Sequence, residues 1–210
     1  EMMNITAVGE ENFTDCANDE YLQYIKAVNA MKLITGENGA FRPDEELDFD
    51  TAVSVVVKAL GYDTQALADG GFPSGYLRIA DSKRLLRGVE KSGVNSITKI
   101  NLLKLFVNAF DEDVLEIKYS PNGTNLTSDR EVTFLNAYAK IYKDKGRITS
   151  NHDIALSGSE KTGVNKITIS GHTMVNKNPA YDALMGYEVT YYYKEADGED
   201  ELVYAASRNK

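Results

Sequence analysis

Apolar residues recur at helical spacing along the first half of the chain. The first stripe consists of Leu22, Ile25, Val28 and Met31, each three residues from the next. This spacing places all four on one face of a helix, which we predict over residues 20–34. Gly36 is expected to end this helix, because glycine readily adopts the left-handed conformation found at helix C-termini.

A second amphipathic helix is predicted after an extended segment that contains Pro43, since proline disfavours helix in the residue before it. Asp48 or Asp50 can cap this helix by accepting hydrogen bonds from its first backbone N–H groups. Its inward face is expected to consist of Ala52, Val56, Ala59 and Leu60. Gly61 closes the helix, and we predict that the glycine-rich residues 63–75 form a linker.

The same order of features occurs twice. Residues 33–61 and 85–110 each contain an apolar pair, a nearby glycine, a polar loop, and an Ile or Leu before a short amphipathic helix. In the second copy, a helix over 76–87 should stop at Gly88, and Thr98 should cap the helix that follows. The residues expected to face inward on that last helix are Leu102, Leu103, Phe106 and Phe110. A repeated unit that cannot bury its own apolar face implies that the copies pack side by side.

The pattern changes after about residue 113. Residues 114–119 are predicted to be extended. Ser128 and Glu131 form a capping box, which predicts a helix over 128–145 that Gly146 ends. Beyond this helix, alternation and β-branched or aromatic residues predict strands over 166–170, 187–194 and 202–206.

These elements predict an α+β protein, with a helical, repeat-built half and a smaller β-rich C-terminal module. We divide the chain into a first repeat, residues 1–63, and a second, degenerate repeat, residues 64–113. Residues 114–210 form the remaining module, a helix followed by strands. Within it, the sequence leaves open whether residues 128–150 form a drifted third repeat.

Composition and charge limit the classes of partner. The 210 residues include 32 Asp and Glu against 23 Lys and Arg, a formal net charge of −9. This acidic balance argues against a nucleic-acid partner, which needs a basic surface, and against docking on anionic lipid. No apolar run is long enough to span a bilayer, so no membrane insertion is expected. The chain also begins without a leader pattern, so any export signal is expected to lie outside this sequence.

Residues that can carry chemistry are scattered. His152 and His172 are the only histidines, and neither has further metal ligands at useful spacing. Cys16 is the single cysteine, and no sequence pattern supplies it with a partner base. We therefore predict surface histidines, a small cysteine that is buried or partly exposed, no metal, no cofactor and no catalytic residue.

Two further groups have a structural and a functional interpretation. The acidic run comprises Asp44, Glu45, Glu46, Asp48 and Asp50. It lacks the mid-loop glycine and closing glutamate of a calcium loop, so a solvated loop plus helix cap is favoured, with calcium as the alternative. Alternation places Tyr191 and Tyr193 on one face of their strand and Tyr192 on the other. Core and cross-strand packing is favoured for these rings, with stacking on sugars or a partner as the alternative.

Short motifs flank the helices of the first copy. They are Phe13-Thr14-Asp15, Leu33-Ile34-Thr35-Gly36, Phe41-Arg42-Pro43-Asp44, and the helix from Leu47 to Ala59-Leu60-Gly61. The second copy keeps Gly88 and Ile97-Thr98-Lys99, without the Phe-x-Pro-Asp motif. In these features the unit resembles the S-layer homology repeat of bacterial surface proteins. Together the two copies cover roughly residues 12–112.

The resemblance implies anchoring to the cell wall. Members of the family commonly arrange three repeats as a bundle and bind secondary cell-wall polysaccharide, often bearing an anionic pyruvate ketal, through an Arg near a helix start. At the Arg position this chain has Phe49 in the first copy and Lys99 in the second. At the family's Glu position it has Thr51 and Asn101. Lys99 is therefore the candidate contact, because a cation at a helix start offers a carboxylate both charge and amide donors.

We therefore predict a non-catalytic, extracellular protein of the bacterial cell wall or S-layer, which anchors or presents other parts there. Its expected partners are an anionic cell-wall polysaccharide and other surface proteins. The alternative is a protein-interaction or scaffold module whose repeats have lost glycan binding. A third interpretation, a fragment of an enzyme that acts on wall glycan or peptide, would require a concave site with perturbed titratable groups.

Overall fold

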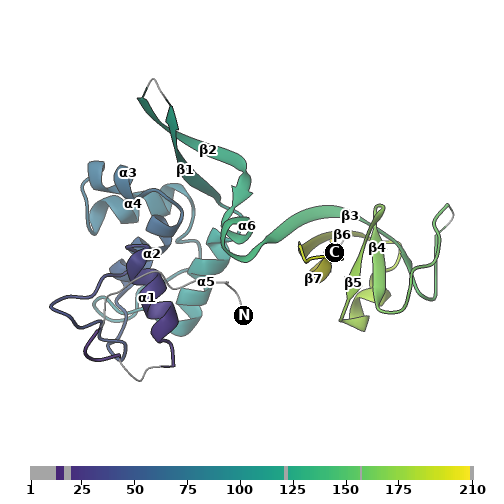
Figure 1. Ribbon diagram of the computed structural model, residues 1–210, viewed down its shortest axis with the longest axis horizontal. Helices are drawn as coiled ribbons and strands as arrows, with labels where there is room; N and C mark the ends of the chain where they lie inside the picture. Colours follow the sequence, from purple (N-terminus) through teal and green to yellow (C-terminus); the bar gives the residue numbers. More distant parts are fainter. Residues whose placement is uncertain (1–12, 17–19, 121–122, 157, 209–210) are drawn as a thin grey trace. The chain divides into compact units, whose positions relative to one another are not determined.

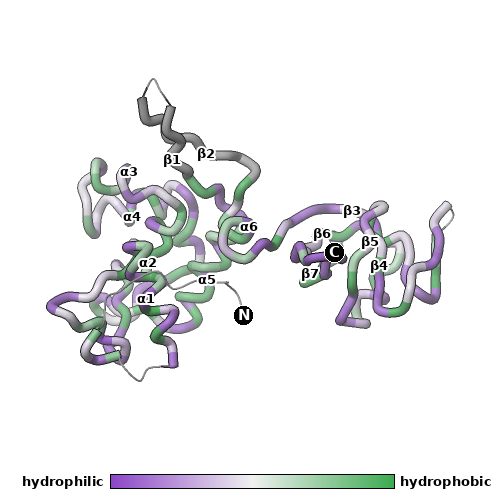
Figure 2. The backbone as a smooth tube through the Cα atoms, in the orientation of Figure 1, coloured by the Kyte–Doolittle hydropathy of each residue, from purple (hydrophilic) through white to green (hydrophobic). Residues whose placement is uncertain are grey.

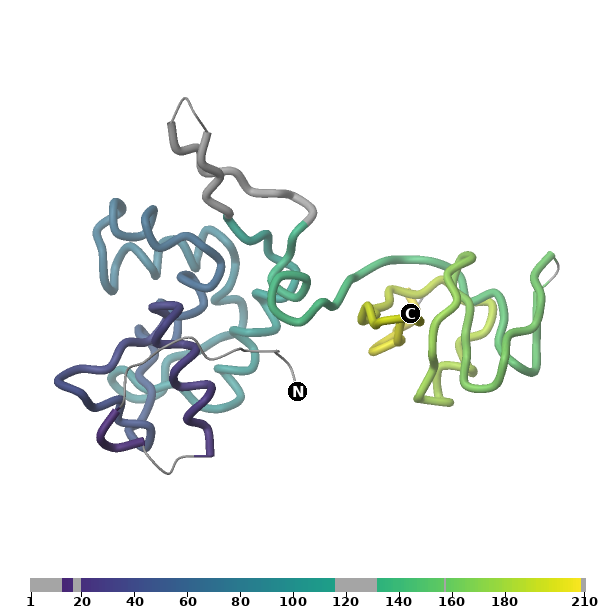
Figure 3. Tube along the Cα trace, in the orientation of Figure 1, coloured from purple at the N-terminus to yellow at the C-terminus, as the bar shows by residue number. Residues whose placement is uncertain are grey.

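The computed structural model of the chain describes residues 13–16, 20–120, 123–156 and 158–208, with backbone alone for residues 116–131. The chain divides into two compact units, residues 1–137 and 138–210 (Figure 1). Figure 3 follows the chain through the helices of the first unit, in purple to teal, and then through the strands of the second, in green to yellow. The predicted α+β class is confirmed.

In the described part of the first unit, five helices precede the first strand. They are α1 (Leu22–Ala30), α2 (Phe49–Ala59), α3 (Asp63–Ala68), α4 (Ser74–Ser82) and α5 (Lys99–Ala109). Helices α1 and α4 have nine residues each, and α2 and α5 have eleven each. The helix lengths of the first pair, α1 and α2, therefore recur in the second pair, α4 and α5. A polar loop joins the two helices of each pair.

Helices α1 and α4 also end in the same way. Each is followed by one residue in the left-handed conformation, Lys32 with φ 55° and Arg84 with φ 56°. The next N–H group then reaches back to the last turn, from Leu33 to the Val28 carbonyl at 2.9 Å and from Leu85 to the Ala80 carbonyl at 2.8 Å. These bonds satisfy carbonyl groups that a helix end otherwise leaves open.

The prediction that Gly36 ends the first helix is wrong. Helix α1 ends at Ala30, and Lys32 provides the left-handed turn in spite of its side chain. Gly36 is needed for a different reason, because a side-chain carbon there would lie 2.4 Å from the ring of Phe13 and 2.7 Å from the Ala40 carbonyl oxygen. Close packing of the loop requires glycine at this position.

Helices α2 and α5 share a capped start. The side chain of Asp48 accepts a hydrogen bond from the Thr51 N–H at 2.8 Å. The side chain of Thr98 accepts one from the Asn101 N–H at 3.3 Å. Each bond satisfies a donor that has no partner within the helix. The predicted cap at Thr98 is confirmed, and of the two candidates in the first copy Asp48, not Asp50, is the cap.

The core of the first unit forms around α2, which packs against both α4 and α5. Its deeply buried apolar residues include Val53, Val56, Val57, Leu60, Ala66, Ala80, Leu85, Leu105 and Ala109. The loop before α5 also reaches the start of α2, where the Phe49 N–H donates to the Asn95 carbonyl at 2.9 Å. The two helix–loop–helix segments therefore contact each other directly.

The predicted linker over 63–75 is wrong in its first part, which forms helix α3 and packs against α4. This short helix buries only Ala66, so it leaves no periodic apolar signal in the sequence. Gly75, in the first turn of α4, allows the two helices to approach. A side-chain carbon at Gly75 would lie 1.9 Å from the Ala66 carbonyl oxygen.

The inward face predicted for α5 is partly wrong. Leu105 and Ala109 are the fully buried apolar residues, whereas Leu103 is exposed. The other three predicted residues, Leu102, Phe106 and Phe110, are partly buried. Apolar residues occur around so much of this helix that spacing alone does not identify the buried face.

A β-hairpin and a short helix follow α5. Strand β1 (Asp113–Ser120) pairs antiparallel with β2 (Gly123–Thr133), and α6 (Phe134–Ala139) comes next. The Leu115 N–H donates to the Leu60 carbonyl at 2.8 Å, which ties the hairpin to the end of α2. The extended segment predicted over 114–119 is confirmed.

The predicted helix over 128–145 is wrong, and no third helix–loop–helix unit forms over 128–150. Strand β2 continues to Thr133, α6 has six residues, and β3 (Ile141–Asn151) takes the rest. Buried positions alternate along the middle of β3, but they are Gly146, Ile148 and Ser150. Because only one of these is apolar, the period of the strand is hidden in the sequence.

The second unit is a closed five-stranded barrel with the order β3-β4-β5-β7-β6. Its further strands are β4 (Lys166–Ile169), β5 (His172–Asn176), β6 (Glu188–Lys194) and β7 (Glu201–Ser207). Strands β5 and β7 are parallel, and all other neighbours are antiparallel. This is the connectivity of the OB-type Greek-key barrel. The strands predicted from the sequence are confirmed.

Side chains fill the barrel. The buried cluster consists of Ile148, Ile167, Ile169, Met174, Val189, Tyr191, Leu202 and Ala205. A 3₁₀ helix, η1 (Pro179–Leu184), lies between β5 and β6 in the chain, and Tyr181 and Leu184 pack against this cluster. The barrel therefore has a solid core, and a ligand would have to bind to its surface.

Candidate functional site

Two of the short sequence motifs, Phe13-Thr14-Asp15 and Phe41-Arg42-Pro43-Asp44, lie together in the structure. Phe13 is buried, and its ring packs against that of Phe41 with centroids 5.3 Å apart. The Thr14 N–H donates to the Gly39 carbonyl at 2.9 Å. These contacts hold together the segments that precede and follow α1, so Phe13 and Phe41 have a structural role.

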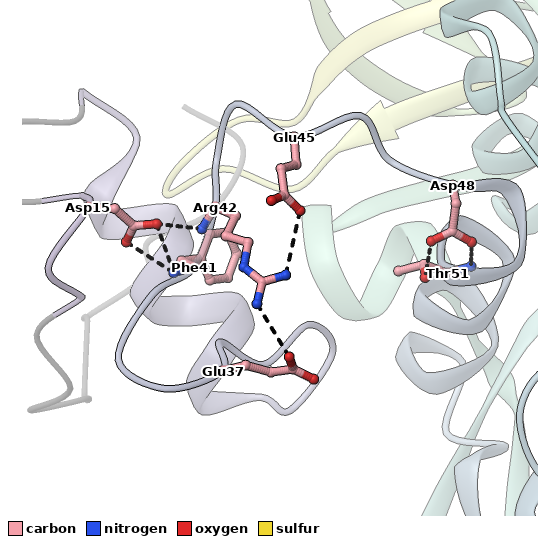
Figure 4. A network of polar contacts seen from close by, with 7 residues as sticks. All are labelled: Asp15, Glu37, Phe41, Arg42, Glu45, Asp48 and Thr51. Carbon is pink, nitrogen blue, oxygen red and sulfur yellow. Dashed lines mark hydrogen bonds and ion pairs between the residues drawn. The ribbon is translucent and has the colours of Figure 1, made fainter.

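Asp15 completes this joint. Its carboxylate accepts hydrogen bonds from the N–H groups of Phe41, at 3.0 Å, and Arg42, at 2.7 Å (Figure 4). These donors hold the pKa of Asp15 below its ordinary value, because they favour the charged form. The Arg42 guanidinium lies between Glu37, at 3.4 Å, and Glu45, at 3.7 Å (Figure 4). The charge of Arg42 is therefore shared with two carboxylates of its own loop.

A lysine of the second copy covers the start of α2, and the sequence patterns gave no sign of it. Lys91 Nζ lies 2.8 Å from the Asp50 carboxylate and 5.0 Å from the centroid of the Phe49 ring. Beside it, Asn95 Nδ2 donates to the Asp48 carboxylate at 3.1 Å. Phe49 is thus buried, with the neutralised ammonium of Lys91 above its ring.

Lys99 has different surroundings. It is the first residue of α5, directly after the Thr98 cap, and it is exposed. No hydrogen bond or ion pair with another residue that the structure describes engages its ammonium. Lys104, one turn later, donates to the Gly88 carbonyl at 2.9 Å and to Asn101 Oδ1 at 3.3 Å. Lys99 therefore keeps its charge available at the positive end of the helix dipole.

The tyrosines of β6 divide between two faces, as the alternation predicts. Tyr191 is buried in the barrel core, and Tyr193 packs beside it with ring centroids 5.9 Å apart. Tyr192 lies on the other face, where its ring meets that of the exposed Tyr204 at 6.1 Å. Burial, together with the Asp144 carboxylate, raises the pKa of Tyr191.

The histidines and the cysteine do not form a chemical site. His152 Nε2 lies 3.1 Å from Asp153, and His172 Nε2 lies 2.7 Å from Asp200 in a separate pair. Cys16 is buried. Within the described ranges, no three His, Cys, Asp or Glu side chains converge in a way that would hold a metal ion.

A shallow groove lies among the described residues of each unit. On the first unit, a groove of about 560 Å³ includes Glu20 and Asp44 but no cation among its described lining residues. On the barrel, a groove of about 360 Å³ contains Glu160 and is otherwise lined mainly by hydroxyl side chains: Thr149, Ser150, Ser159, Thr168, Ser170 and Thr173. Hydroxyl groups both donate and accept hydrogen bonds, so the second groove suits an uncharged polar ligand.

No family model, curated protein or solved structure matches the chain. Function must therefore be argued from the residues themselves, because folds such as this barrel host many unrelated functions. Among the described helices, none has the length and apolar character needed to cross a bilayer.

Proposed function

We propose that the chain is a non-catalytic protein of the bacterial cell surface, whose S-layer homology-type repeats anchor it to the cell wall or present it there. Its ligand in this proposal is an anionic cell-wall polysaccharide, and Lys99 makes the contact. The proposal places the protein in the extracellular wall or S-layer. The observation that carries it is the recurrence of helix lengths, a left-handed residue and a side-chain cap in two helix–loop–helix segments.

Local structure supports the duplication beyond the sequence pattern. The two helix pairs agree in length, in the left-handed residue after the first helix and in the side-chain cap of the second. Such agreement between segments of dissimilar sequence is expected of two copies of one unit. In the first copy, the motif residues Phe13, Asp15 and Phe41 also contact one another, so the motif corresponds to a physical joint.

Lys99 supports a weak, salt-dependent contact with an anion. A charge-assisted hydrogen bond contributes about 1.5–3 kcal/mol, and lysine lacks the two-pronged geometry of arginine. Added salt screens such an exposed interaction. A polysaccharide presents many anionic groups, so several anchored copies would gain avidity along one polymer.

The test is co-sedimentation of the purified chain with isolated cell-wall polysaccharide at low and high salt. We expect binding at low salt, a loss of roughly tenfold for Lys99→Ala, and tighter binding for Lys99→Arg. Lys161→Ala, which removes an exposed lysine of the barrel unit, is the matched control and should bind as the unmodified chain does. Polysaccharide stripped of its acidic substituents should not bind.

Two results would contradict different parts of this proposal. Absence of binding at low salt would remove the anchoring role altogether. Binding that survives Lys99→Ala unchanged would keep the role and exclude Lys99 as the contact.

A second candidate function is a protein-interaction or scaffold module whose repeats have lost glycan binding. It is favoured by the exposed apolar side chains Ile100, Leu103 and Val107 of α5, which glycan binding does not use. Failure of the chain to bind polysaccharide, together with self-association or capture of another surface protein, would favour this candidate.

A further inference from the structure

Helix α5 carries an exposed apolar stripe. Ile100, Leu103 and Val107 are separated by three and four residues, so they lie on one face of the helix. Their exposed fractions are 60%, 60% and 59%. Figure 2 shows green, hydrophobic stretches along both α5 and α2. Three large aliphatic side chains in line on one helix mark a face that usually packs against something.

The equivalent face of α2 is buried. Val53 and Val57 follow their helix cap at the same distances as Leu103 and Val107 follow theirs, and both have an exposed fraction of 0%. Helix α2 is covered by α4 and α5 together, whereas the main helical neighbour of α5 is α2. The face that α2 buries at Val53 and Val57 is thus the face that α5 leaves exposed at Leu103 and Val107, where it is available to a further helix.

Helix α1, which corresponds to α4 in the first helix pair, also has an uncovered face. Tyr24 and Tyr76 are both the third residue of their helices. Tyr76 has an exposed fraction of 3% and lies 5.9 Å from Lys58 Nζ of α2, so it faces that helix. Tyr24 of α1 has an exposed fraction of 41%, and Met31, at the end of α1, is exposed as well.

We propose that α5 of one molecule packs against α1 of a second copy of this chain, which repeats between molecules the α2–α4 contact that exists within one. The occupant is a second copy because the chain itself carries the complementary face. The contact is heterologous, with different surfaces on the two partners, so each molecule keeps one free face and the array can grow or close into a ring. This inference does not depend on glycan binding.

The contact should be weak for one molecular pair. Stable interfaces bury about 1,200–2,000 Å² in total, and one pair of short helices falls at or below the lower limit. We therefore expect association that rises with concentration over the range from about 5 to 500 µM. Crowding on a cell surface would favour it further.

Sedimentation velocity of the full chain tests the proposal. The unmodified chain should form dimers and larger species as concentration rises. Leu103→Glu and Tyr24→Glu should each remain monomeric, because a charge then faces the apolar partner. The matched control is Leu67→Glu on α3, where the leucine is 57% exposed and lies outside both faces, and it should associate normally. Far-UV circular dichroism should show that all three variants remain folded.

Mixing the two monomeric variants separates this contact from a symmetric one. Leu103→Glu retains α1 intact and Tyr24→Glu retains α5 intact, so a mixture has one working interface and should form dimers that grow no further. A chain that stays monomeric throughout the concentration range would overturn the proposal. Association of Tyr24→Glu on its own would also overturn it, because α5 would then pair with itself.

Discussion

The approach of α3 to α4 offers a direct test of packing in the first unit. We predict that Gly75→Ala destabilises this unit. The added side-chain carbon would lie 1.9 Å from the Ala66 carbonyl oxygen and 2.9 Å from its carbon, whereas ordinary contact begins at 3.4 Å. Since the obstacle is backbone, it cannot rotate away, and one helix must shift.

Two effects of opposite sign decide the magnitude. Alanine is favoured over glycine in a helix by about 1 kcal/mol, and by less in the first turn. Overpacking typically costs about 1–3 kcal/mol, and a backbone clash belongs at the upper end. The clash should therefore prevail, with a net loss of about 1–2 kcal/mol. For a unit of this size, the melting temperature would fall by about 2–8 °C.

Thermal unfolding followed by far-UV circular dichroism measures this loss, because the first unit contains most of the helix. Gly163→Ala in the barrel unit is the matched control, since the nearest atom to the new carbon is Lys166 Cδ at 3.8 Å. That substitution should be neutral or stabilise by up to about 1 kcal/mol, since it restricts the unfolded chain without a clash. A Gly75→Ala protein that melts at or above the temperature of the unmodified chain would refute the packing argument.

Two further predictions concern pH. The pKa of Asp15 is lowered in the folded state, so its stabilising effect is present above about pH 4 and is lost as pH falls through the folded pKa. Asp15→Asn should flatten the acid limb of a melting-temperature profile, and an unchanged limb would contradict the role of the carboxylate. Burial and the hydrogen bond to Asp63 raise the pKa of Tyr76 to about 12. The contribution of Tyr76 to stability should therefore be complete below about pH 10 and decline as pH rises through 12, and Tyr76→Phe should reduce the alkaline loss of stability without altering the acid side.

Features set by neighbouring residues were predictable from the sequence. The cap at Thr98 and the extended segment over 114–119 depend on local residue types, and the structure contains both. Regular alternation likewise identified β6, since its residues Val189 and Tyr191 are both apolar and inward-facing. The placement of Tyr191 and Tyr193 on one face of β6 and of Tyr192 on the other followed from the same two-residue period.

Features set by distant partners were not predictable. Strand β2 forms because it pairs with β1, and the capping-box pattern at Ser128 and Glu131 favoured a helix instead. The inward positions of β3 include Gly146 and Ser150, which carry no apolar signal. At the candidate site, the position of Lys99 at a helix start was predictable, but the coverage of Phe49 by Lys91 comes from another loop and had no local signature.

Because the Phe49 N–H donates to the Asn95 carbonyl, the start of α2 depends on the loop between α4 and α5. Helix α2 therefore cannot be moved to another protein with this hydrogen bond intact unless the loop that contains Asn95 moves with it. A chimera that kept α2 without this loop would leave the Phe49 N–H without its acceptor and the Phe49 ring without Lys91 above it. Chimeras should instead exchange the whole of residues 1–137, which form one compact unit of the chain.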